Sequence, residues 1–339
     1  MALRTRLTDV AEQAGVSTAT VSRVLNGKPG VAEETRRAVL AALDLLGYER
    51  PDKLRTKAAG LVGLVVPELT NPVFPAFAQH IETHLAEAGY TPLLGTQAPG
   101  GATEEQYIDA MVERHVDGII FVSGLHADSR ADTAWYDRLL AMDIPFVVMN
   151  GTNPRIPAPA FSIDERRSMD IAVRHLHSLG HTRIGLATGQ ERYIPTQGKM
   201  RGFRDSMRRQ LEQADPPVVN TLFTLEGGRA AAGMLLDQGC TAIVCGSDLM
   251  ALGAIQLVRS RGLQAPDDVS VVGFDDSPLI AFTDPPLTTL RQPVEPMCRS
   301  AVTTLVSMIE GGPAPRTEIL FLPELIVRGS TGPAPGERA

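Results

Sequence analysis

The residues best suited to chemistry near the N-terminus are small polar side chains around a single arginine, in the string STATVSRVLN at 17–26. If this string is helical, Val21, Val24 and Leu25 share one face and the polar residues share the opposite face. Such a polar face suits the DNA major groove, because Arg can donate two hydrogen bonds to guanine while hydroxyls reach phosphates or base edges. The residues expected to face outward are Thr18, Ala19, Ser22, Arg23 and Asn26.

The sequence lacks the short motifs that carry common catalytic or metal chemistry. It contains no P-loop, no G-x-S-x-G string and no H-E-x-x-H string. Of its seven histidines, His175 and His177 lie two residues apart, and residues at that spacing point away from each other on a helix. We therefore expect no enzyme, no metal site and no cofactor, although an enzyme is kept as an alternative.

Amphipathic segments on both sides of this polar stripe predict a small helical domain. Apolar residues recur at helical spacing over 7–14 and again over 39–46. Gly15 can adopt the positive φ that a tight turn needs, and Ser17 is well placed to cap the helix that follows. The sequence therefore predicts a helix-turn-helix within residues 1–48.

Beyond residue 60 the pattern changes to short apolar runs separated by amphipathic segments. Runs that are apolar on both faces are typical of parallel strands lying between layers of helices. We therefore expect an α/β core at 61–330, joined to the helical domain by a charged linker at 49–60 and followed by a frayed tail at 331–339. The runs are LVGLVV (61–66), TPLLGT (91–96), GIIFVS (118–123), PFVVMN (145–150), RIGLAT (183–188), TAIVCG (241–246) and VSVVGF (269–274).

Two lobes fit this core. The first is expected to span about 61–160 and 290–322, and the second about 161–289 and 323–330. The string TTLRQP (288–293) would cross back to the first lobe, with a helix and two last strands after it.

The charge of the chain is distributed unevenly. Residues 1–60 hold ten Lys and Arg against seven Asp and Glu, a net charge of +3, so the rest carries −10 within a total of −7. Because phosphate repels an acidic body, any contact with DNA must run through the N-terminal segment.

The compartment is predicted from the cysteines and from the lack of long apolar segments. Cys240, Cys245 and Cys298 form no metal-type doublet and cannot all pair within one chain, which favours a reducing environment. The start MALRTRLTDV has no apolar run behind its arginines, and the longest apolar runs are too short to span a bilayer. We therefore expect a soluble, cytoplasmic protein with no membrane partner.

Several strings resemble the lactose-repressor (LacI/GalR) family of transcription regulators. DVAEQAGVSTATVSRVLNG, followed by EETRRAVLAALDLLGY, is similar to the family's DNA-binding headpiece. VPELTNPVF, GSDLMALGAI, PDDVSVVGFDD, LTTLRQP and ELIVRGST then match its core in order, so the resemblance covers nearly the whole chain. It implies a helix-turn-helix headpiece and a two-lobed core like that of periplasmic sugar-binding proteins.

The resemblance also implies which headpiece residues contact operator DNA. Thr18 and Ala19 fall at the two main specificity positions, and Arg23 at the guanine-reading position. Ala19 can offer only an apolar contact, such as one with a thymine methyl group. For each residue the alternative is a helix cap or a solvated helix face. The residues expected near phosphates are Ser17, Thr20, Ser22 and Asn26.

Two features depart from the family pattern. Ala32 stands where a Ser or Thr usually caps the third helix, a change that costs about 1 kcal/mol. The segment between Tyr48 and Leu54 is a few residues shorter than usual. Leu54 aligns with the leucine that the family's hinge helix wedges into the minor groove, and Arg55 beside it would contact phosphate. The alternative is a plain linker with solvated charges.

In the core, the resemblance implies a small-molecule effector in the cleft between the lobes. Asp275 could accept two hydroxyl hydrogen bonds, while Phe74 and Phe223 could offer apolar faces to a sugar ring or a planar base. Lys199 replaces the usual Arg, which exchanges a bidentate fork for a point charge. The alternatives are a turn-stabilising role for Asp275, core packing for the phenylalanines and a helix cap for Asp248. The other expected effector contacts are Tyr193 at the mouth, and Ser247 and Asp248 in GSDLM.

These features together predict a sequence-specific transcription regulator, expected to be a repressor. Its partners would be double-stranded operator DNA, a small-molecule effector for which a sugar is favoured, and a second copy of the chain. The homodimer would form through the core, because the tail has no apolar heptads. The alternatives are a solute-binding module without DNA function and a transcription activator of the same fold.

Overall fold

A computed structural model describes residues 7–25, 31–46, 60–97 and 100–336. The chain divides into two compact units, 1–59 and 60–339, and each is described by itself.

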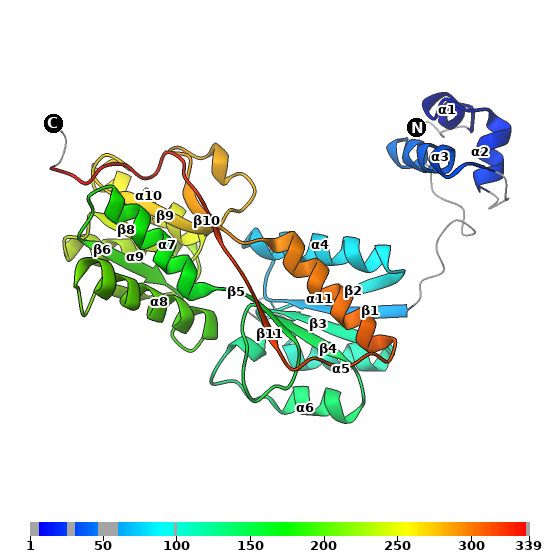
Figure 1. Cartoon of the computed structure of the whole chain (residues 1–339), viewed down its shortest axis with the longest axis horizontal. Coiled ribbons are helices and arrows are strands. Elements are labelled where there is room, and N and C mark those ends of the chain that lie inside the picture. The colour runs from blue at the N-terminus through cyan, green and yellow to red at the C-terminus, as the bar shows by residue number, and fades with distance from the viewer. Residues whose placement is uncertain (1–6, 26–30, 47–59, 98–99, 337–339) are drawn as a thin grey trace. The chain divides into compact units, whose positions relative to one another are not determined.

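Three helices build the first unit: α1 (Leu7–Gln13), α2 (Thr18–Leu25) and α3 (Glu33–Leu45) (Figure 1). Gly15 has a φ of +63° at the turn between α1 and α2, and the Ser17 hydroxyl accepts a hydrogen bond from the backbone N–H of Thr20 at 3.1 Å. The sequence prediction of a turn glycine and a serine cap is therefore confirmed. The small core consists of Val10, Ala11, Val21, Val24, Leu25, Val39, Ala42 and Leu43.

Two six-stranded sheets form the second unit, each with its own helices. The first sheet and its helices are called lobe 1, and the second sheet and its helices lobe 2. In spatial order, lobe 1 contains β11 (Glu318–Phe321), β5 (Ala160–Ile163), β4 (Phe146–Met149), β3 (Gly118–Val122), β1 (Gly60–Val66) and β2 (Tyr90–Thr96). Lobe 2 contains β12 (Glu324–Ile326), β10 (Thr288–Arg291), β9 (Ser270–Asp275), β8 (Ala242–Cys245), β6 (Ile184–Thr188) and β7 (Val218–Asn220).

The strands are parallel throughout, except that β12 pairs antiparallel with β10. Strands such as β3 are buried on both faces, which is why they read as continuous apolar runs in the sequence. All seven runs singled out from the sequence are strands, and the predicted α/β fold class is confirmed. β5 and β7 were not predicted, because their sequences, AFSI and VVN, form no extended apolar run.

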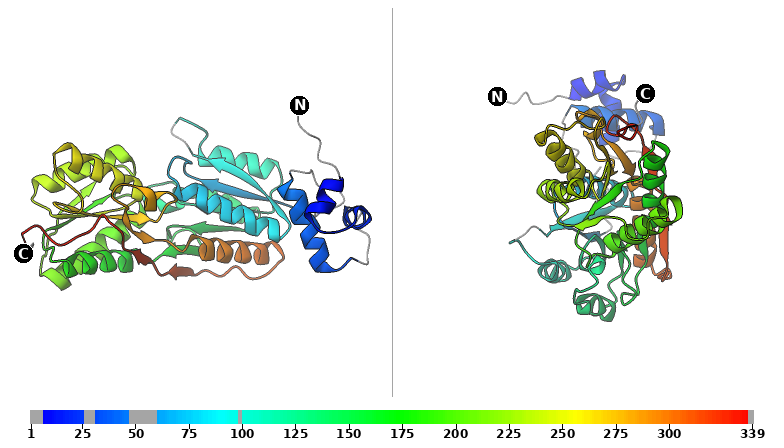
Figure 2. Two further views of the ribbon diagram at one scale, coloured as in Figure 1. Left: turned by 90° about the horizontal axis from the view of Figure 1, so that it is seen from above. Right: turned by 90° about the vertical axis from the view of Figure 1, so that its left-hand side faces the viewer.

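Helices cover both faces of each sheet (Figures 1 and 2). Separate apolar clusters form where each pair of helices meets its sheet, so every lobe has two core layers. Lobe 1 is covered by α4 (Val73–Glu87) and α11 (Val294–Ile309) on one face, and by α5 (Glu104–Glu113) and α6 (Ala134–Ala141) on the other. Lobe 2 is covered by α7 (Glu165–Ser178) and α8 (Ile194–Leu211) on one face, and by α9 (Leu225–Asp237) and α10 (Asp248–Ser260) on the other.

The chain crosses between the lobes three times. The first crossing follows β5 at Asp164, the second follows β10 at 292–293, and the third lies between β11 and β12 at 322–323. The first and third crossings are adjacent, since the N–H of Asp164 donates to the carbonyl of Phe321 at 2.8 Å. Lobe 1 thus extends through Ile163, a few residues past the boundary expected from the sequence, because β5 pairs with β4 and β11.

The prediction for the C-terminal segment is wrong. The sequence suggests a frayed tail at 331–339, but the described part, up to residue 336, is docked on lobe 2 (Figure 2). Ser330 is fully buried, and its hydroxyl donates to the Val271 carbonyl at 2.6 Å. The Ala334 N–H donates to the Leu179 carbonyl at 2.8 Å. The segment is polar and contains prolines, and backbone hydrogen bonds hold it in place. Such bonds require no periodic pattern of side chains, so the docking could not be predicted from the sequence.

Over the described ranges, no helix has both the length and the apolar character needed to cross a membrane.

Candidate functional site

The helix α2 presents the polar stripe that the sequence predicts. Val21 and Val24 are buried in the headpiece core, while Thr18, Ala19 and Arg23 are exposed on the opposite side. Ser22 is also exposed, and Thr20 is half-buried. The hydroxyls of Ser17 and Thr20 lie 2.9 Å apart and share a hydrogen bond at the start of the helix. Three other predicted DNA contacts, Asn26, Leu54 and Arg55, lie outside the described residues.

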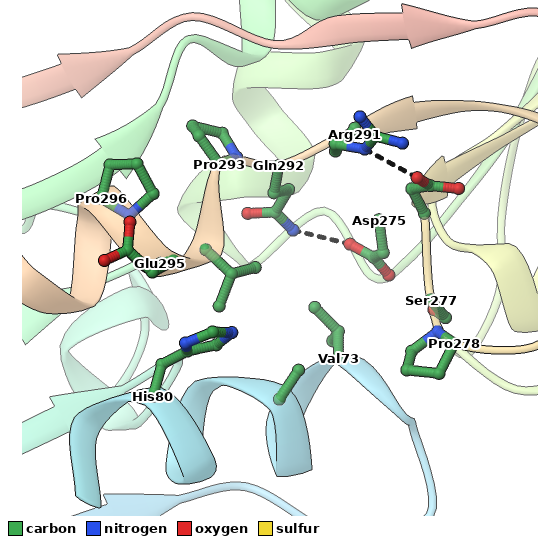
Figure 3. A pocket seen from close by; sticks show the side chains of 13 residues that line it. Val73, His80, Asp275, Ser277, Pro278, Arg291, Gln292, Pro293, Glu295 and Pro296 are labelled. Carbon is green, nitrogen blue, oxygen red and sulfur yellow. Dashed lines mark hydrogen bonds and ion pairs between the residues drawn. The ribbon is translucent and has the colours of Figure 1, made fainter. Parts of the chain in front are cut away.

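A cavity of about 350 Å³ lies between the lobes (Figure 3). Its lobe 1 wall is the start of α4, and its lobe 2 wall is the segment after β9. The second crossing, which leads from β10 into α11, closes it. The lining residues are Val73, Ala76, His80, Asp275, Asp276, Ser277, Pro278, Arg291, Gln292, Pro293, Val294, Glu295 and Pro296.

Asp275 is the main polar group of this cavity. It ends β9 with a φ of +119° and is only 7% exposed. Its Oδ1 accepts a hydrogen bond from Nε2 of Gln292 at 2.6 Å (Figure 3). Burial, followed by repulsion from Asp248, raises the pKa of Asp275 well above its usual value. Among the described residues, no group donates a hydrogen bond to its second oxygen, Oδ2.

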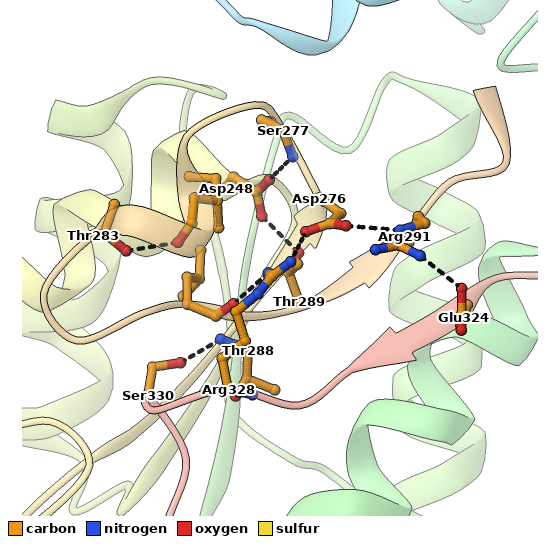
Figure 4. A network of polar contacts seen from close by, with 12 residues as sticks. Asp248, Asp276, Ser277, Thr283, Thr288, Thr289, Arg291, Glu324, Arg328 and Ser330 are labelled. Atoms are coloured by element: carbon orange, nitrogen blue, oxygen red, sulfur yellow. Dashed lines mark hydrogen bonds and ion pairs between the residues drawn. The ribbon is translucent and has the colours of Figure 1, made fainter. Parts of the chain in front are cut away.

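Asp248 and Ser247 have structural partners close to this cavity. The Ser247 hydroxyl caps α10 by accepting from the Met250 N–H at 3.3 Å. The carboxylate of Asp248 accepts from the Ser277 N–H at 2.7 Å and from the Thr289 hydroxyl at 2.6 Å (Figure 4). Interpreting Asp248 as the helix cap is therefore wrong, because Ser247 fills that position. Asp248 instead fixes the segment after β9 to β10, and burial raises its pKa to about 6.

A second carboxylate network joins that segment to the crossings. Asp276 accepts from Arg291 at 2.7 Å and from Arg328 at 2.6 Å (Figure 4). Arg291 also pairs with Glu324 at 3.1 Å, so it connects the second and third crossings. These bonds hold Asp275 and Asp276 in place at the edge of the cleft.

Lys199 has protein partners for its charge. Its side chain is 4% exposed, and its Nζ lies 2.6 Å from Oε2 of Glu165. The ammonium also lies 3.8 Å from the ring centroid of Phe274. Phe274 directly precedes Asp275 in β9, and attraction to Lys199 favours the ionised form of Asp275. Lys199 is not among the residues that line the described cavity.

The aromatic candidates are separated from one another. Phe74 is half-buried on α4 and packs against the lobe 1 core. Phe223 packs in lobe 2 over Gly189 and Gly246, where any Cβ would collide with its ring. Tyr193 precedes α8 and contacts lobe 1 through a backbone bridge to Asp128. The structure thus brings together Asp275, Asp248 and Lys199, but not the three aromatic residues.

Buried polar atoms without a partner among the described residues gather at the carboxyl ends of the strands. Ligands of open α/β sheets bind at this edge, and sequence reasoning missed these residues. Asn150, Thr152, Thr188 and Ser277 lie at the end of an apolar run or shortly after it, which was an available signal. His80 lines the cavity and was also missed. Its helical spacing from Val73 and Ala76 was a different signal, because it places the three residues on one face of α4. The unpartnered atoms at this edge are Asn150 Oδ1, Thr152 Oγ1, Thr188 Oγ1, Thr196 Oγ1, Ser277 Oγ and Gln292 Oε1.

In the comparison with known proteins, two family models match the chain, each over a different part. A family model described as "Bacterial regulatory proteins, lacI family" matches residues 6–51. A second, described as "Periplasmic binding protein-like domain", matches residues 173–331.

Relatives resemble the chain over nearly its whole length. The HTH-type transcriptional regulator MalR of Streptomyces coelicolor is 59% identical, with 99% of both chains covered. The HTH-type transcriptional repressor CytR of Escherichia coli is 34% identical, with 96% of both covered. Among solved structures, the complex of the transcriptional regulator CelR with cellobiose has a TM-score of 0.72 at 30% identity, covering 96% of this chain and 100% of that one. The chain therefore belongs to the lacI family of bacterial regulatory proteins and is a DNA-binding transcriptional regulator.

Proposed function

We propose that this regulator is a repressor whose affinity for its operator is controlled by a sugar bound in the cleft beside Asp275. The observation that carries the proposal is the pair of open acceptors in the interlobe cavity, Asp275 Oδ2 and Gln292 Oε1. Hydroxyl groups are the donors that match such acceptors. Two relatives support the proposal, one bound to cellobiose and one named a repressor.

A neutral sugar suits the cavity better than an anion. Asp275, Asp276 and Glu295 line it, and the one arginine among the lining residues, Arg291, is already paired with Asp276 and Glu324. An anionic effector would therefore be repelled, while a polyol can donate to the carboxylates. Val73 and Ala76 on α4 offer an apolar wall to the carbon face of a ring.

On the DNA side, the exposed face of α2 is proposed to enter the major groove. Thr18 and Ala19 would read the sequence with Arg23, and Ser17, Thr20, Ser22 and Asn26 would support phosphate contacts. Leu54 and Arg55 of the linker stay predictions for the minor groove. As a DNA-binding regulator, the protein is proposed to act in the cytoplasm.

We also infer that the regulator works as a homodimer through its core. Two apolar side chains of the segment 279–282 support this, because Leu279 is 74% exposed and Phe282 is 86% exposed. A dimer would place two headpieces on a palindromic site. In sedimentation velocity, Phe282→Glu should shift the protein towards the monomer, whereas Leu140→Glu on α6, a control at another exposed leucine, should leave the dimer intact.

Two experiments test the proposed function. Sequencing the genomic fragments that the protein retains should return one palindromic motif upstream of genes for sugar uptake or breakdown. Fluorescence anisotropy on that motif, with a panel of neutral mono- and disaccharides, should find one sugar that changes operator affinity roughly 5–150-fold, the usual range of allosteric coupling. A regulator that answers only to anionic metabolites would contradict the proposal.

A further inference from the structure

The loop after β3 in lobe 1 meets the loop after β6 in lobe 2. The N–H and the hydroxyl of Ser129 both donate to the carbonyl of Arg192, at 2.9 Å and 2.7 Å. Asp128 and Tyr193 form an antiparallel backbone bridge beside them. Gln197, in the first turn of α8, donates to the Ser129 hydroxyl at 3.3 Å. The contact therefore connects the two lobes at a place distinct from the three crossings.

Charge adds to this contact. Nε of Arg192 lies 3.4 Å from Oδ2 of Asp128, across the gap between the lobes. The Asp128 carboxylate is 9% exposed and is fixed by its own loop, because Oδ1 accepts from the Arg130 N–H at 2.9 Å. On the other lobe, the Arg192 guanidinium lies 4.9 Å from the ring centroid of Tyr193 and donates to its hydroxyl at 2.9 Å. Both ends of the ion pair thus also have partners within their own lobes.

The contact continues directly into the cleft through α8. Tyr193 precedes α8, and Thr196 in its first turn has a buried hydroxyl without a partner among the described residues. Lys199, one turn later, lies over the ring of Phe274, which directly precedes Asp275. Separation of the two loops would therefore move the start of α8 relative to lobe 1.

We propose that Asp128, Ser129 and Arg192 form an interlobe latch that favours the closed cleft and so sets the effector concentration at which the regulator responds. The inference rests on the proposed function only in its last step, since the latch acts on the lobes whether or not a ligand is present. These residues are positioning residues and touch no ligand. Hydrogen bonds and half-exposed ion pairs are individually weak, so the latch biases the equilibrium between open and closed states without freezing it.

The interlobe distance in the ligand-free protein tests the latch directly. Cys240, Cys245 and Cys298 are buried, so spin labels will react at cysteines introduced at two exposed positions, Glu113→Cys on α5 and Arg208→Cys on α8. Labelled protein is diluted in unlabelled protein, so that a dimer holds at most one labelled chain. Pulsed electron–electron double resonance on the full-length protein without DNA or sugar then gives the distribution of distances between the lobes.

Variants of Arg192 should change that distribution, and a matched control should not. Arg192→Ala is expected to add a population at longer distance, and Arg192→Lys should retain much of the short one because the charge remains. Arg155→Ala is the control, because Arg155 donates to the Ser129 carbonyl at 3.1 Å from within lobe 1. Identical distributions for Arg192→Ala and the parent, or an equal effect of Arg155→Ala, would overturn the latch.

Hydrogen exchange provides a measurement without labels. The Ser129 amide is protected only while it donates to Arg192, so its exchange rate should rise several-fold in Arg192→Ala, whereas the amide of Ile119 within β3 should not change. Unchanged exchange at Ser129 would also overturn the latch. Because neither measurement includes a sugar, failure of the latch and failure of the proposed function are distinguishable: a chain that binds no sugar still reports its interlobe distance.

Discussion

Glu165 and Lys199 form an ion pair of 2.6 Å that joins the first crossing to α8. Glu165 opens α7 directly after Asp164, where the chain has just left lobe 1. Backbone contacts reinforce the junction, since a Cβ at Gly202 of α8 would lie 2.5 Å from the Cα of Arg166. The start of α8 therefore has a fixed position relative to the crossing that leads into lobe 2.

Removing only one partner of this ion pair should lower the stability of the protein. Lys199→Met leaves Glu165 buried without its cation, and the free energy of unfolding is expected to fall by about 3–5 kcal/mol. The double variant Lys199→Met/Glu165→Gln removes both charges and should recover most of that loss. Urea unfolding of the three proteins at neutral pH measures this. A double variant as unstable as the single one would show that packing, not charge, is the reason.

The exposed arginine of α2 should determine sequence discrimination. Arg23→Ala is expected to weaken operator binding by about 1–3 kcal/mol and to relax the preference at one base pair in each half-site. Binding to operator variants and to random DNA at one salt concentration measures this. Equal losses on operator and random DNA would mean that Arg23 contacts phosphate only.

The buried aspartate of the cavity should be needed for the response but not for DNA binding. Asp275→Asn keeps the volume of the side chain and tolerates the positive φ, but it replaces one of the two carboxyl oxygens with an amide donor. We expect the effect of the sugar on operator affinity to disappear, with ligand-free affinity nearly unchanged. Asp143→Asn is the matched control, because Asp143 also has a positive φ but is exposed after α6. A full response in Asp275→Asn would place the effector elsewhere.

The stability of the core should depend on pH through Asp248. Burial raises the pKa of Asp248 from 3.8 to about 6, so the folded protein binds this proton more tightly than the unfolded chain. The contribution is therefore fully present below about pH 4 and is lost as the pH rises through about 6. Asp248→Asn cannot titrate, and its amide can still accept from the Ser277 N–H and donate to Thr289. Its stability relative to the parent should rise by on the order of 2–3 kcal/mol between about pH 4 and about pH 7, measured by urea unfolding. Parallel pH profiles for the two proteins would contradict this.

Sequence patterns predicted the fold more fully than the site. Strands such as β3 are buried on both faces, so burial alone makes them visible as apolar runs. β5, with the sequence AFSI, gains its place in lobe 1 from pairing with the preceding strand β4 and with β11, which lies far away in sequence. Pairing of this kind leaves no local pattern.

The same limit applies to the site. The resemblance to a known family led to Asp275 and Ser247, although their role with a ligand stays a prediction. The partner of Asp275, Gln292, lies on the second crossing, and the partner of Lys199, Glu165, lies 34 residues away on another helix. Which side chains meet at a cleft depends on how the crossings bring the lobes together, and spacing along the chain does not report that.

The three crossings also determine the order in which the parts of the chain can fold during synthesis. The helices of the headpiece are complete once Leu45 has been made, so that unit can fold early. Lobe 1 has no such independence, because its edge strand β11 ends at Phe321, close to the end of the chain. While the ribosome produces lobe 2, the edge of β5 lacks its neighbour and offers unpaired backbone groups to other nascent chains. Protection of this edge by a chaperone during translation would therefore matter more for this protein than for one whose lobes are contiguous in sequence.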